Sequence, residues 1–533
     1  MAGARLPHRG KEGPGPRLTS GDVVAGVTMA LVLIPQSLAY AQVAGLPAHV
    51  GLYAAALPPL AAAFFASSPY LQTGPAAVTA ILTAGALAPL AAAGSAEYVR
   101  LAALLALVVG VIRVGIGLLR AGKVVFLMSE PVLRGFTTGA AILILASQVS
   151  GAVGLAPEGS GLSAAFRAFG EWREWQGQAL AAAAATILVV VSVRRLHPLA
   201  PGVLIASVGA VVVSALAGYD APVLGAIPEG LPPLSLALPF SAVPSLALAG
   251  AVIALAGFSE AASIARTYAT RERQRWDPDR EFISQGVANL AAGISGGFPV
   301  GGSFSRSSIA HMAGAKTRWS GAVTGAAVLA FLPFANVLAP LPIAVLSALV
   351  MTAVVGLIRP GQVLVLWRLS RPQFLVAATT LVLTLALAPH IEQAVVLGIL
   401  LAGAIHLWRE FHVLVDRWTD EGALHLRPHG VLWFGSAEAL KSEVLDLLAE
   451  HQDASAVVFH VERLGRVDLT GALVLEQLVT DLRSAGVAVR VEGVHRRTAR
   501  ALRRVLAVSR QGRTAEPAEP PAPTPVGRPE EGP

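Results

Sequence analysis

Apolar segments, each close to the length that crosses a lipid bilayer, follow one another along the chain from about Asp22 to Trp408. A membrane-spanning helix needs about 20 predominantly apolar residues, and only helices or closed barrels satisfy every backbone polar group inside lipid. Charged residues make up only 14% of the 533 residues, against about 25% in soluble proteins. The sequence therefore predicts an all-α polytopic membrane domain.

We count fourteen segments of unequal length in this part of the chain. Two of the short ones are interrupted at their start by glycine and proline. The expected spans are 22–43, 50–66, 75–91, 98–119, 131–153, 178–194, 198–217, 245–268, 281–297, 303–314, 320–338, 342–357, 373–388 and 391–408.

The charges of the loops predict the orientation of these spans. Cytoplasmic loops carry an excess of lysine and arginine, whereas the stretches 218–244 and 335–342 contain neither. If the N-terminus is inside, the loops after the even-numbered spans are cytoplasmic. Both termini are then expected in the cytoplasm, and the protein is expected in the cell (inner) membrane. The basic residues of these loops are Arg120, Lys123, Arg134, Arg194, Arg195, Arg266, Arg271, Arg273, Arg275, Arg280, Lys316, Arg318, Arg359, Arg368 and Arg371.

Fourteen spans divide into two sets of seven, at about 18–218 and 240–410. An odd-numbered repeat enters the membrane in the opposite orientation the second time, as in inverted-repeat transporters. The third span of the first set opens at Thr73-Gly74-Pro75, and that of the second follows the glycine-rich stretch 296–302. The fold class predicted is 7+7 inverted repeats with two half-helices.

The residues at the second break suit an anion. Unpaired N–H groups and the macrodipole make a helix N-terminus attractive to negative charge. Ser303 and Ser305 add hydroxyl donors, and Arg306 adds a permanent positive charge. An arginine at this depth needs a cavity or a partner, so the alternative is that Arg306 belongs to a structural ion pair near the membrane edge.

Other polar residues occur inside the expected spans. Glu260 lies in the middle of the eighth span, where it is a candidate proton carrier or cation ligand. The alternative is a purely structural interaction of Glu260 with a backbone group or with Arg306. Gln36 and Tyr40 lie one helical turn apart beside Pro35, and either line a cavity or pack a kinked helix. Arg113 in the fourth span is expected to extend its guanidinium toward the membrane surface.

Three stretches resemble the sulfate permease (SulP) family of anion transporters, relatives of prestin and pendrin. They are IPQSLAYAQVAGLPAHVGLYAA, which runs from the first span into the second, Glu260–Ala269 in the eighth, and GGFPVGGSFSRSS at the tenth. The resemblance implies core and gate domains, a homodimer, and an anion site between the third and tenth spans. Glu260 would be the coupling residue. The substrate-binding positions implied are Gln36, Tyr40, Ala76, Ala77, Phe304, Ser305 and Arg306.

The chain departs from the prestin pattern at Ala76, where that relative has an aromatic residue. A smaller side chain suggests a roomier pocket, which leaves sulfate, bicarbonate and dicarboxylates open as substrates. The expected function is proton-coupled secondary active transport by an elevator-like movement. Sodium-coupled bicarbonate symport, anion exchange and channel-like conduction are the alternatives. A nucleobase symporter is disfavoured because Arg306 stands where that class would need a carboxylate.

The pattern changes after about Gly422, where short strands and amphipathic helices alternate. Strands are expected at Val431–Phe434, Ala456–His460 and Val487–Glu492, and helices at Ala437–Glu450 and Ala472–Ser484. The region 420–508 resembles a STAS domain. Its Asp468-Leu469-Thr470-Gly471 resembles the loop whose hydroxyl residue can be phosphorylated in anti-sigma antagonists. Thr470 is therefore a candidate regulatory residue, with an ordinary helix N-cap as the alternative.

Composition excludes several other functions. The chain has no cysteine, and its twelve histidines are scattered, so no metal centre, cofactor or enzyme active site is expected. Its net charge of +7 reflects topology-setting loops, so no nucleic-acid partner is expected. The ends, 1–17 and 509–533, are expected to be disordered, which leaves 18–410 as the transport domain.

Overall fold

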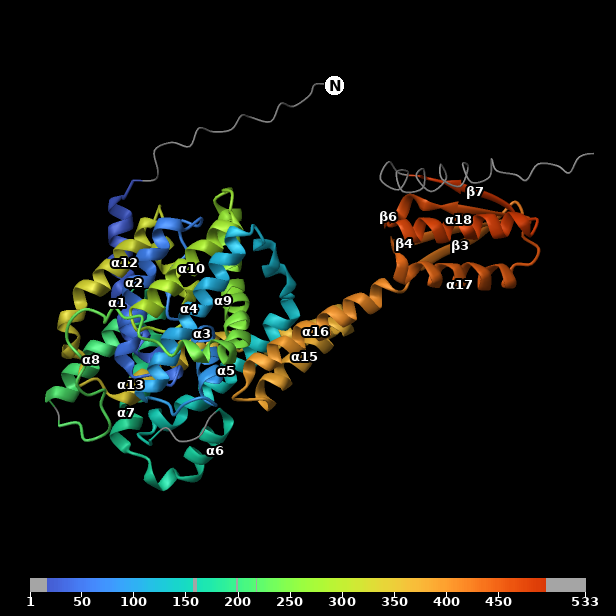
Figure 1. The fold of residues 1–533 in the computed structure, drawn as a ribbon. Helices are drawn as coiled ribbons and strands as arrows, with labels where there is room; N and C mark the ends of the chain where they lie inside the picture. Colours follow the sequence, from blue (N-terminus) through green and yellow to red (C-terminus); the bar gives the residue numbers. More distant parts are fainter. Residues whose placement is uncertain (1–16, 157–160, 198–199, 217, 495–533) are drawn as a thin grey trace, which may run out of the picture. The chain divides into compact units, whose positions relative to one another are not determined.

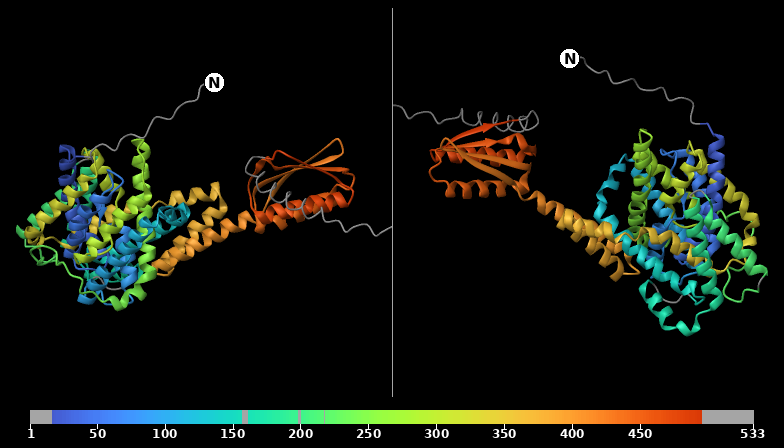
Figure 2. Two further views of the ribbon diagram at one scale, coloured as in Figure 1. Left: turned by 45° about the horizontal axis from the view of Figure 1, so that its top comes forward. Right: turned by 180° about the vertical axis from the view of Figure 1, so that it is seen from behind.

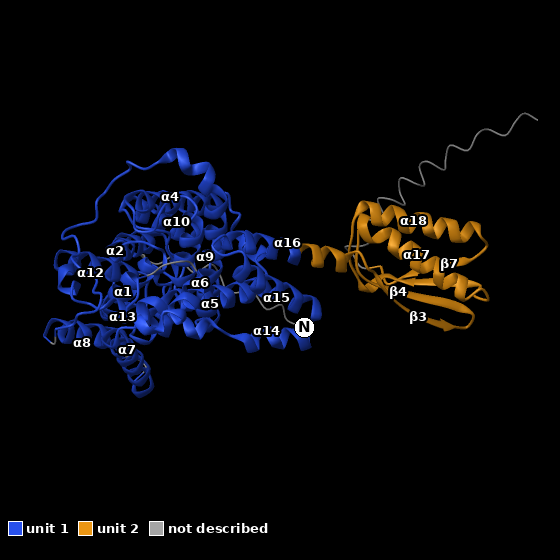
Figure 3. Cartoon of the chain, turned by 90° about the horizontal axis from the view of Figure 1, so that it is seen from below, with its two compact units in different colours: residues 1–402 blue, residues 403–533 orange. Residues whose placement is uncertain are grey.

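The computed structural model describes residues 17–156, 161–197, 200–216 and 218–494, which divide into two compact units between Ala402 and Gly403 (Figures 1 and 3). The two expected disordered ends lie outside the described residues, apart from Arg17. The first unit is helical. The second is a small α/β domain (Figure 2).

Each of the fourteen expected spans contains a helix, which confirms the all-helical membrane domain. Nine helices within the described residues are long and apolar enough to cross a bilayer. Two short helices that were not expected, α6 (Leu162–Gly170) and α14 (Pro360–Leu369), lie between spans. The fourteen are α1 (Ser20–Val43), α2 (Ala48–Phe65), α3 (Ala77–Leu87), α4 (Ala96–Leu118), α5 (Glu130–Ala152), α7 (Gly177–Leu196), α8 (Gly202–Leu216), α9 (Val243–Arg271), α10 (Pro278–Ile294), α11 (Phe304–Met312), α12 (Trp319–Phe331), α13 (Ile343–Val354), α15 (Arg371–Ala386) and α16 (Ile391–Glu410).

The helix contacts repeat between the two halves. α2 packs on α12 as α10 packs on α4, α1 contacts α12 as α9 contacts α4, and α1 contacts α11 as α9 contacts α3. In each of these comparisons, replacing every span of one half by the corresponding span of the other half converts the first contact into the second. The inverted repeat predicted from the sequence is confirmed.

The third span of each half is a half-helix that begins inside the fold. α3 has 11 residues and α11 has 9. A two-residue strand precedes each, β1 (Thr73–Gly74) and β2 (Gly301–Gly302), and the two strands pair antiparallel with Gly74 opposite Gly301. A side chain at Gly302 would place its Cβ 3.0 Å from the Ala261 Cβ, so glycine permits this close approach. The pairing brings the two helix breaks together.

Two buried carboxylates hold the chain at the ends of helices in this unit. Asp22, in the first turn of α1, accepts the N–H of Thr317 at 2.8 Å. Glu281, in the first turn of α10, accepts the N–H of Ser68 at 2.8 Å. Both side chains are fully buried. Each carboxylate thus pairs backbone N–H groups that would otherwise be buried without a partner.

Replacing Gly51 by alanine should destabilise the fold by about 1–3 kcal/mol, because overpacking a tight contact forces the backbone to move. The new Cβ in α2 would clash with the Ser37 carbonyl oxygen of α1. The matched control is Gly115→Ala in α4, where nothing lies within 4 Å. Thermal unfolding of both purified variants in one detergent measures the difference. Equal melting temperatures would show that α1 and α2 are not packed this closely.

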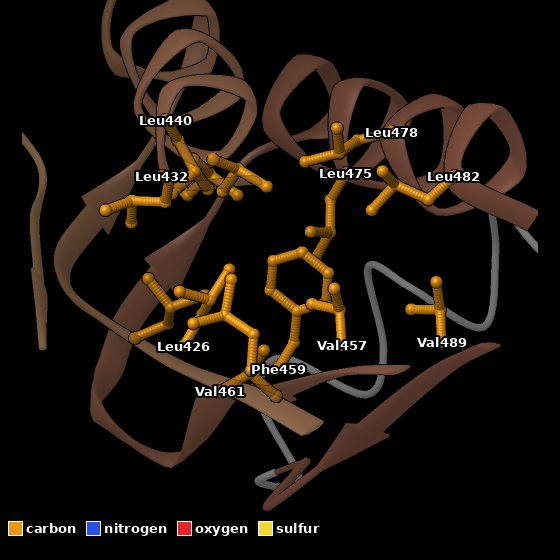
Figure 4. Packing of buried hydrophobic residues seen from close by; sticks show 14 of the residues in the cluster. Leu426, Leu432, Leu440, Val457, Phe459, Val461, Leu475, Leu478, Leu482 and Val489 are labelled. Carbon is orange, nitrogen blue, oxygen red and sulfur yellow. The ribbon is translucent and has the colours of Figure 1, made fainter. Parts of the chain in front are cut away.

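The second unit is a mixed sheet with two helices on one face. The sheet order is β3-β4-β5-β7, with β6 also paired to β4; β3 is antiparallel and the other pairings are parallel. Leu426, Leu440, Phe459 and Leu475 are among the side chains that fill the space between helices and sheet (Figure 4). The elements are β3 (Leu414–Asp420), β4 (Ala423–Leu432), α17 (Phe434–Glu450), β5 (Ala456–His460), β6 (Leu464–Val467), α18 (Leu469–Ser484) and β7 (Ala488–Glu492).

The strands and helices expected after Gly422 are present, with one shift. The strand expected at Val431–Phe434 is the end of the longer β4, and Phe434 already begins α17. β3 and β6 were not expected. β3 carries Asp416, Arg417 and Asp420 and is largely exposed, so it lacks the apolar pattern that marks a buried strand.

Candidate anion-binding site

The starts of α3 and α11 form the centre of the candidate site. Ala76 is the N-cap of α3 and Ser303 that of α11, and neither N-cap side chain accepts a hydrogen bond from its helix. The Phe304 N–H at the start of α11 faces the Glu260 carboxylate. The other N-terminal N–H groups have no N-cap side chain as acceptor, and both macrodipoles are positive at these ends. Because β1 and β2 pair directly before the two helices, the two positive ends lie in one region.

Arg306, in the first turn of α11, is a buried cation without a hydrogen-bond partner. Its side chain is 1% exposed, and within the described residues Nε, Nη1 and Nη2 all lack an acceptor. A Cβ built on Gly74 would lie 3.6 Å from Nη2, which places the guanidinium beside the first break. The structural ion pair considered from the sequence is not formed by the described residues. Burying an unpaired guanidinium is costly, and a bound anion would supply the missing acceptors.

Two predicted residues lie close to Arg306. The Glu260 carboxylate of α9 faces the Phe304 N–H and is a charge neighbour of Arg306. The Tyr40 hydroxyl of α1 is buried and is a charge neighbour of both Arg306 and Glu260. The fold therefore brings α1, α9 and α11 together around one cation.

The remaining predicted positions differ in exposure. Ala76 and Ala77 are buried at the start of α3. Gln36 is half-buried one turn from Tyr40, and its Oε1 has no partner within the described residues. Phe304 and Ser305 are exposed, and the Ser305 Oγ lies 3.4 Å from that of Ser303. They present side chains outward from the same helix start that buries Arg306.

The backbone of Gln72 and the side-chain amide of Gln285, which sequence reasoning did not single out, position the two breaks. The Gln72 N–H donates to the Ser307 Oγ at 2.9 Å, and the Gln72 carbonyl accepts the Ser303 N–H at 3.2 Å. Gln285 of α10 donates to the Thr73 Oγ1 at 2.7 Å. These bonds fix the strand before α3 to the start of α11. Polar residues in the otherwise apolar span 281–297 were the sequence signal that could have revealed Gln285.

Arg113 does not reach the membrane surface, so the expectation of an extended side chain is wrong. Its side chain is fully buried and donates from Nε to the Ala254 carbonyl at 3.1 Å, from Nη2 to that of Ile253 at 3.0 Å, and from Nη1 to that of Val300 at 3.0 Å. α4 packs against α9 and α10, which supplies carbonyl acceptors inside the protein. The guanidinium satisfies its donors there and has no need of the headgroup region.

Thr470 lies in the second unit, exposed at the second residue of α18. The N-cap of this helix is Asp468, which accepts the Gly471 N–H at 2.7 Å and the Phe434 N–H at 3.2 Å. The capping role considered for this loop therefore falls to Asp468. The Thr470 hydroxyl is left accessible beside a helix N-terminus.

Inverted repeats with two half-helices that meet beside a buried guanidinium, which has no acceptor among the described residues, are the architecture of a membrane transporter. The model of the sulfate permease family matches residues 20–380, and that of the STAS domain matches 416–508. The chain belongs to the sulfate permease family and is an integral membrane anion transporter.

Individual relatives match between about two thirds and nine tenths of this chain. The chain is 33% identical over 503 residues to a probable sulfate transporter of Mycobacterium tuberculosis, covering 88% of each chain. It is 32% identical over 399 residues to human solute carrier family 26 member 6, covering 69% of this chain and 52% of that protein. Murine solute carrier 26 family member A9 has a similar fold, with a TM-score of 0.82 and 20% identity over 92% of this chain and 88% of that one. The transmembrane domain of the cyanobacterial bicarbonate transporter BicA matches with a TM-score of 0.63 and 24% identity. The match covers 71% of this chain and 97% of that one.

Proposed function

We propose that this protein is a secondary active transporter of small inorganic or carboxylate anions, bound between the N-termini of α3 and α11. The observation that carries the proposal is Arg306, a buried cation whose donors have no acceptor among the described residues. Gln36, Tyr40, Ala76, Ala77, Phe304 and Ser305 would line the site. Sulfate, bicarbonate and a dicarboxylate are the candidate substrates, and the sulfate transporters among its relatives favour sulfate.

The transport movement proposed is elevator-like. The half-helices belong to a group in which α1, α2, α4, α9, α10 and α12 contact one another, whereas α5, α7, α13 and α15 pack in a second group. A site held mainly by one group can move with it past the other. Shear or hinge movement of packed groups is a common basis of such transitions.

Proton coupling is proposed to pass through Glu260, with sodium as the alternative coupling ion. A carboxylate beside Arg306 and the Phe304 N–H can exchange a proton while the anion is bound. We further propose a homodimer in the cell (inner) membrane with cytoplasmic termini. Phosphorylation of the exposed Thr470 would add charge at the start of α18, where it is tolerated; mass spectrometry of protein purified from its own cells would detect it.

The proposal is tested by uptake into proteoliposomes containing the full-length protein. Labelled sulfate, bicarbonate, oxalate, fumarate, succinate and chloride are offered in turn, with an imposed pH or sodium gradient. Saturable uptake of at least one anion, accelerated by an inward proton gradient, is expected. Non-saturating currents without accumulation would instead indicate a channel-like conductor.

A further inference from the structure

A second guanidinium lies near the two breaks and has no acidic partner in the part of the chain that the structure describes. Arg113 of α4 is fully buried, and its hydrogen bonds go to three backbone carbonyls. None of the ion pairs among the described residues includes it. Carbonyl dipoles satisfy its donors but leave its full positive charge, and the interior screens that charge less than water does.

Arg113 also fixes the chain directly before β2. Its Nη1 donates to the Val300 carbonyl at 3.0 Å, and Asn289 of α10 bonds the same residue. The Asn289 Oδ1 accepts the Val300 N–H at 3.0 Å, and its Nδ2 donates to the Val300 carbonyl at 3.1 Å. Both polar groups of Val300 are therefore held where the chain passes into Gly301.

Each of the two guanidinium groups lies beside a different segment of the β1–β2 pairing. Arg306 Nη2 lies beside Gly74, whose partner across the pairing is Gly301, and Arg113 holds the residue before Gly301. Arg113 Nη2 would also lie 2.8 Å from a Cβ at Gly257, one helical turn before Glu260 on α9. The region thus contains two buried cations and one carboxylate.

We propose that Arg113 is a positioning and specificity-determining residue that favours divalent over monovalent anions at this site. The inference rests on the proposed function, since it assumes that the anion binds between α3 and α11. Arg113 would act without touching the anion, through its charge and through Val300. A coulombic contribution is proportional to the charge of the ligand, and this proportionality separates it from a merely structural role.

The test uses full-length protein in proteoliposomes and whichever labelled anion the wild type carries. Inhibition constants are measured for divalent sulfate and oxalate and for monovalent nitrate and formate. If Arg113→Gln raises the monovalent constants about threefold, the divalent constants should rise about ninefold, because the energy lost doubles with the charge. Arg113→Lys keeps the positive charge but not the three hydrogen bonds of the guanidinium, so its divalent and monovalent constants should change by the same factor.

The inference would be overturned if Arg113→Gln changed the divalent and monovalent inhibition constants by the same factor. It would also be overturned if Arg113→Lys showed the same valence-dependent loss as Arg113→Gln. Either result would leave the proposed function intact. A wild type that carries none of the anions would overturn both. Should Arg113→Gln fail to fold, Gly257→Ala provides the same test, because its methyl group would meet Nη2 at 2.8 Å and displace the charge. It should weaken divalent anions more than monovalent ones, and an unchanged ratio would contradict the proposal.

Discussion

Replacing Arg306 by glutamine should lower anion uptake at subsaturating concentration by about 30- to 700-fold. The reason is that losing one partner of a buried charge pair costs about 2–4 kcal/mol, and every 1.4 kcal/mol is about tenfold in affinity. Arg306 is 1% exposed and has no protein acceptor among the described residues, so in the transport cycle its partner would be the anion. Initial rates across a range of concentrations in proteoliposomes measure the loss.

The matched control is Arg266→Gln, which makes the same chemical change at an exposed residue of α9. The guanidinium of Arg266 lies over the exposed Phe126 ring and has no place in the proposed site. Uptake close to that of the wild type is expected for it. Were Arg306→Gln to transport as well as this control, the guanidinium of Arg306 would not be an anion ligand.

Glu260→Gln should remove proton coupling while preserving anion binding. With one proton carried per anion, an inward gradient of one pH unit provides about 1.4 kcal/mol, or about tenfold accumulation. Glutamine keeps the shape and a hydrogen-bonding group beside Phe304 and Arg306, but it cannot exchange a proton. The variant should lose the whole tenfold factor and still exchange internal for external anion. Accumulation of labelled anion at imposed pH differences measures it.

The control for this variant is Glu97→Gln, a carboxylate exposed at the start of α4. It should accumulate anion as the wild type does. Persistent proton-driven accumulation in Glu260→Gln would refute the carrier role. A response of the wild type to sodium gradients alone would assign coupling to sodium instead.

The membrane domain could be predicted from the sequence because the bilayer permits so few backbone structures. Each apolar segment had to be a helix, and the loop arginines set the alternation that separates two sets of seven. The paired breaks followed from glycine and proline at corresponding positions. The same physics indicated Arg306 and Glu260, since a charged residue inside a span is energetically costly and is therefore usually functional.

The rest depends on contacts between segments far apart in sequence. Nothing in the fourth span shows that Arg113 meets carbonyls of Ile253, Ala254 and Val300 rather than the headgroups, and its role was misjudged for that reason. Asn289 was likewise not singled out, because an amide inside a span predicts that a hydrogen bond is formed but does not identify its partner. β3 was missed because its exposed, charged residues resemble a loop.

A structure of the full-length protein with bound selenate, located by its anomalous scattering, tests the anion site most directly. Selenate should lie between the first N–H groups of α3 and α11, within hydrogen-bonding distance of the Arg306 guanidinium. Selenate bound elsewhere, with the Arg306 donors still lacking an acceptor, would contradict the proposed site.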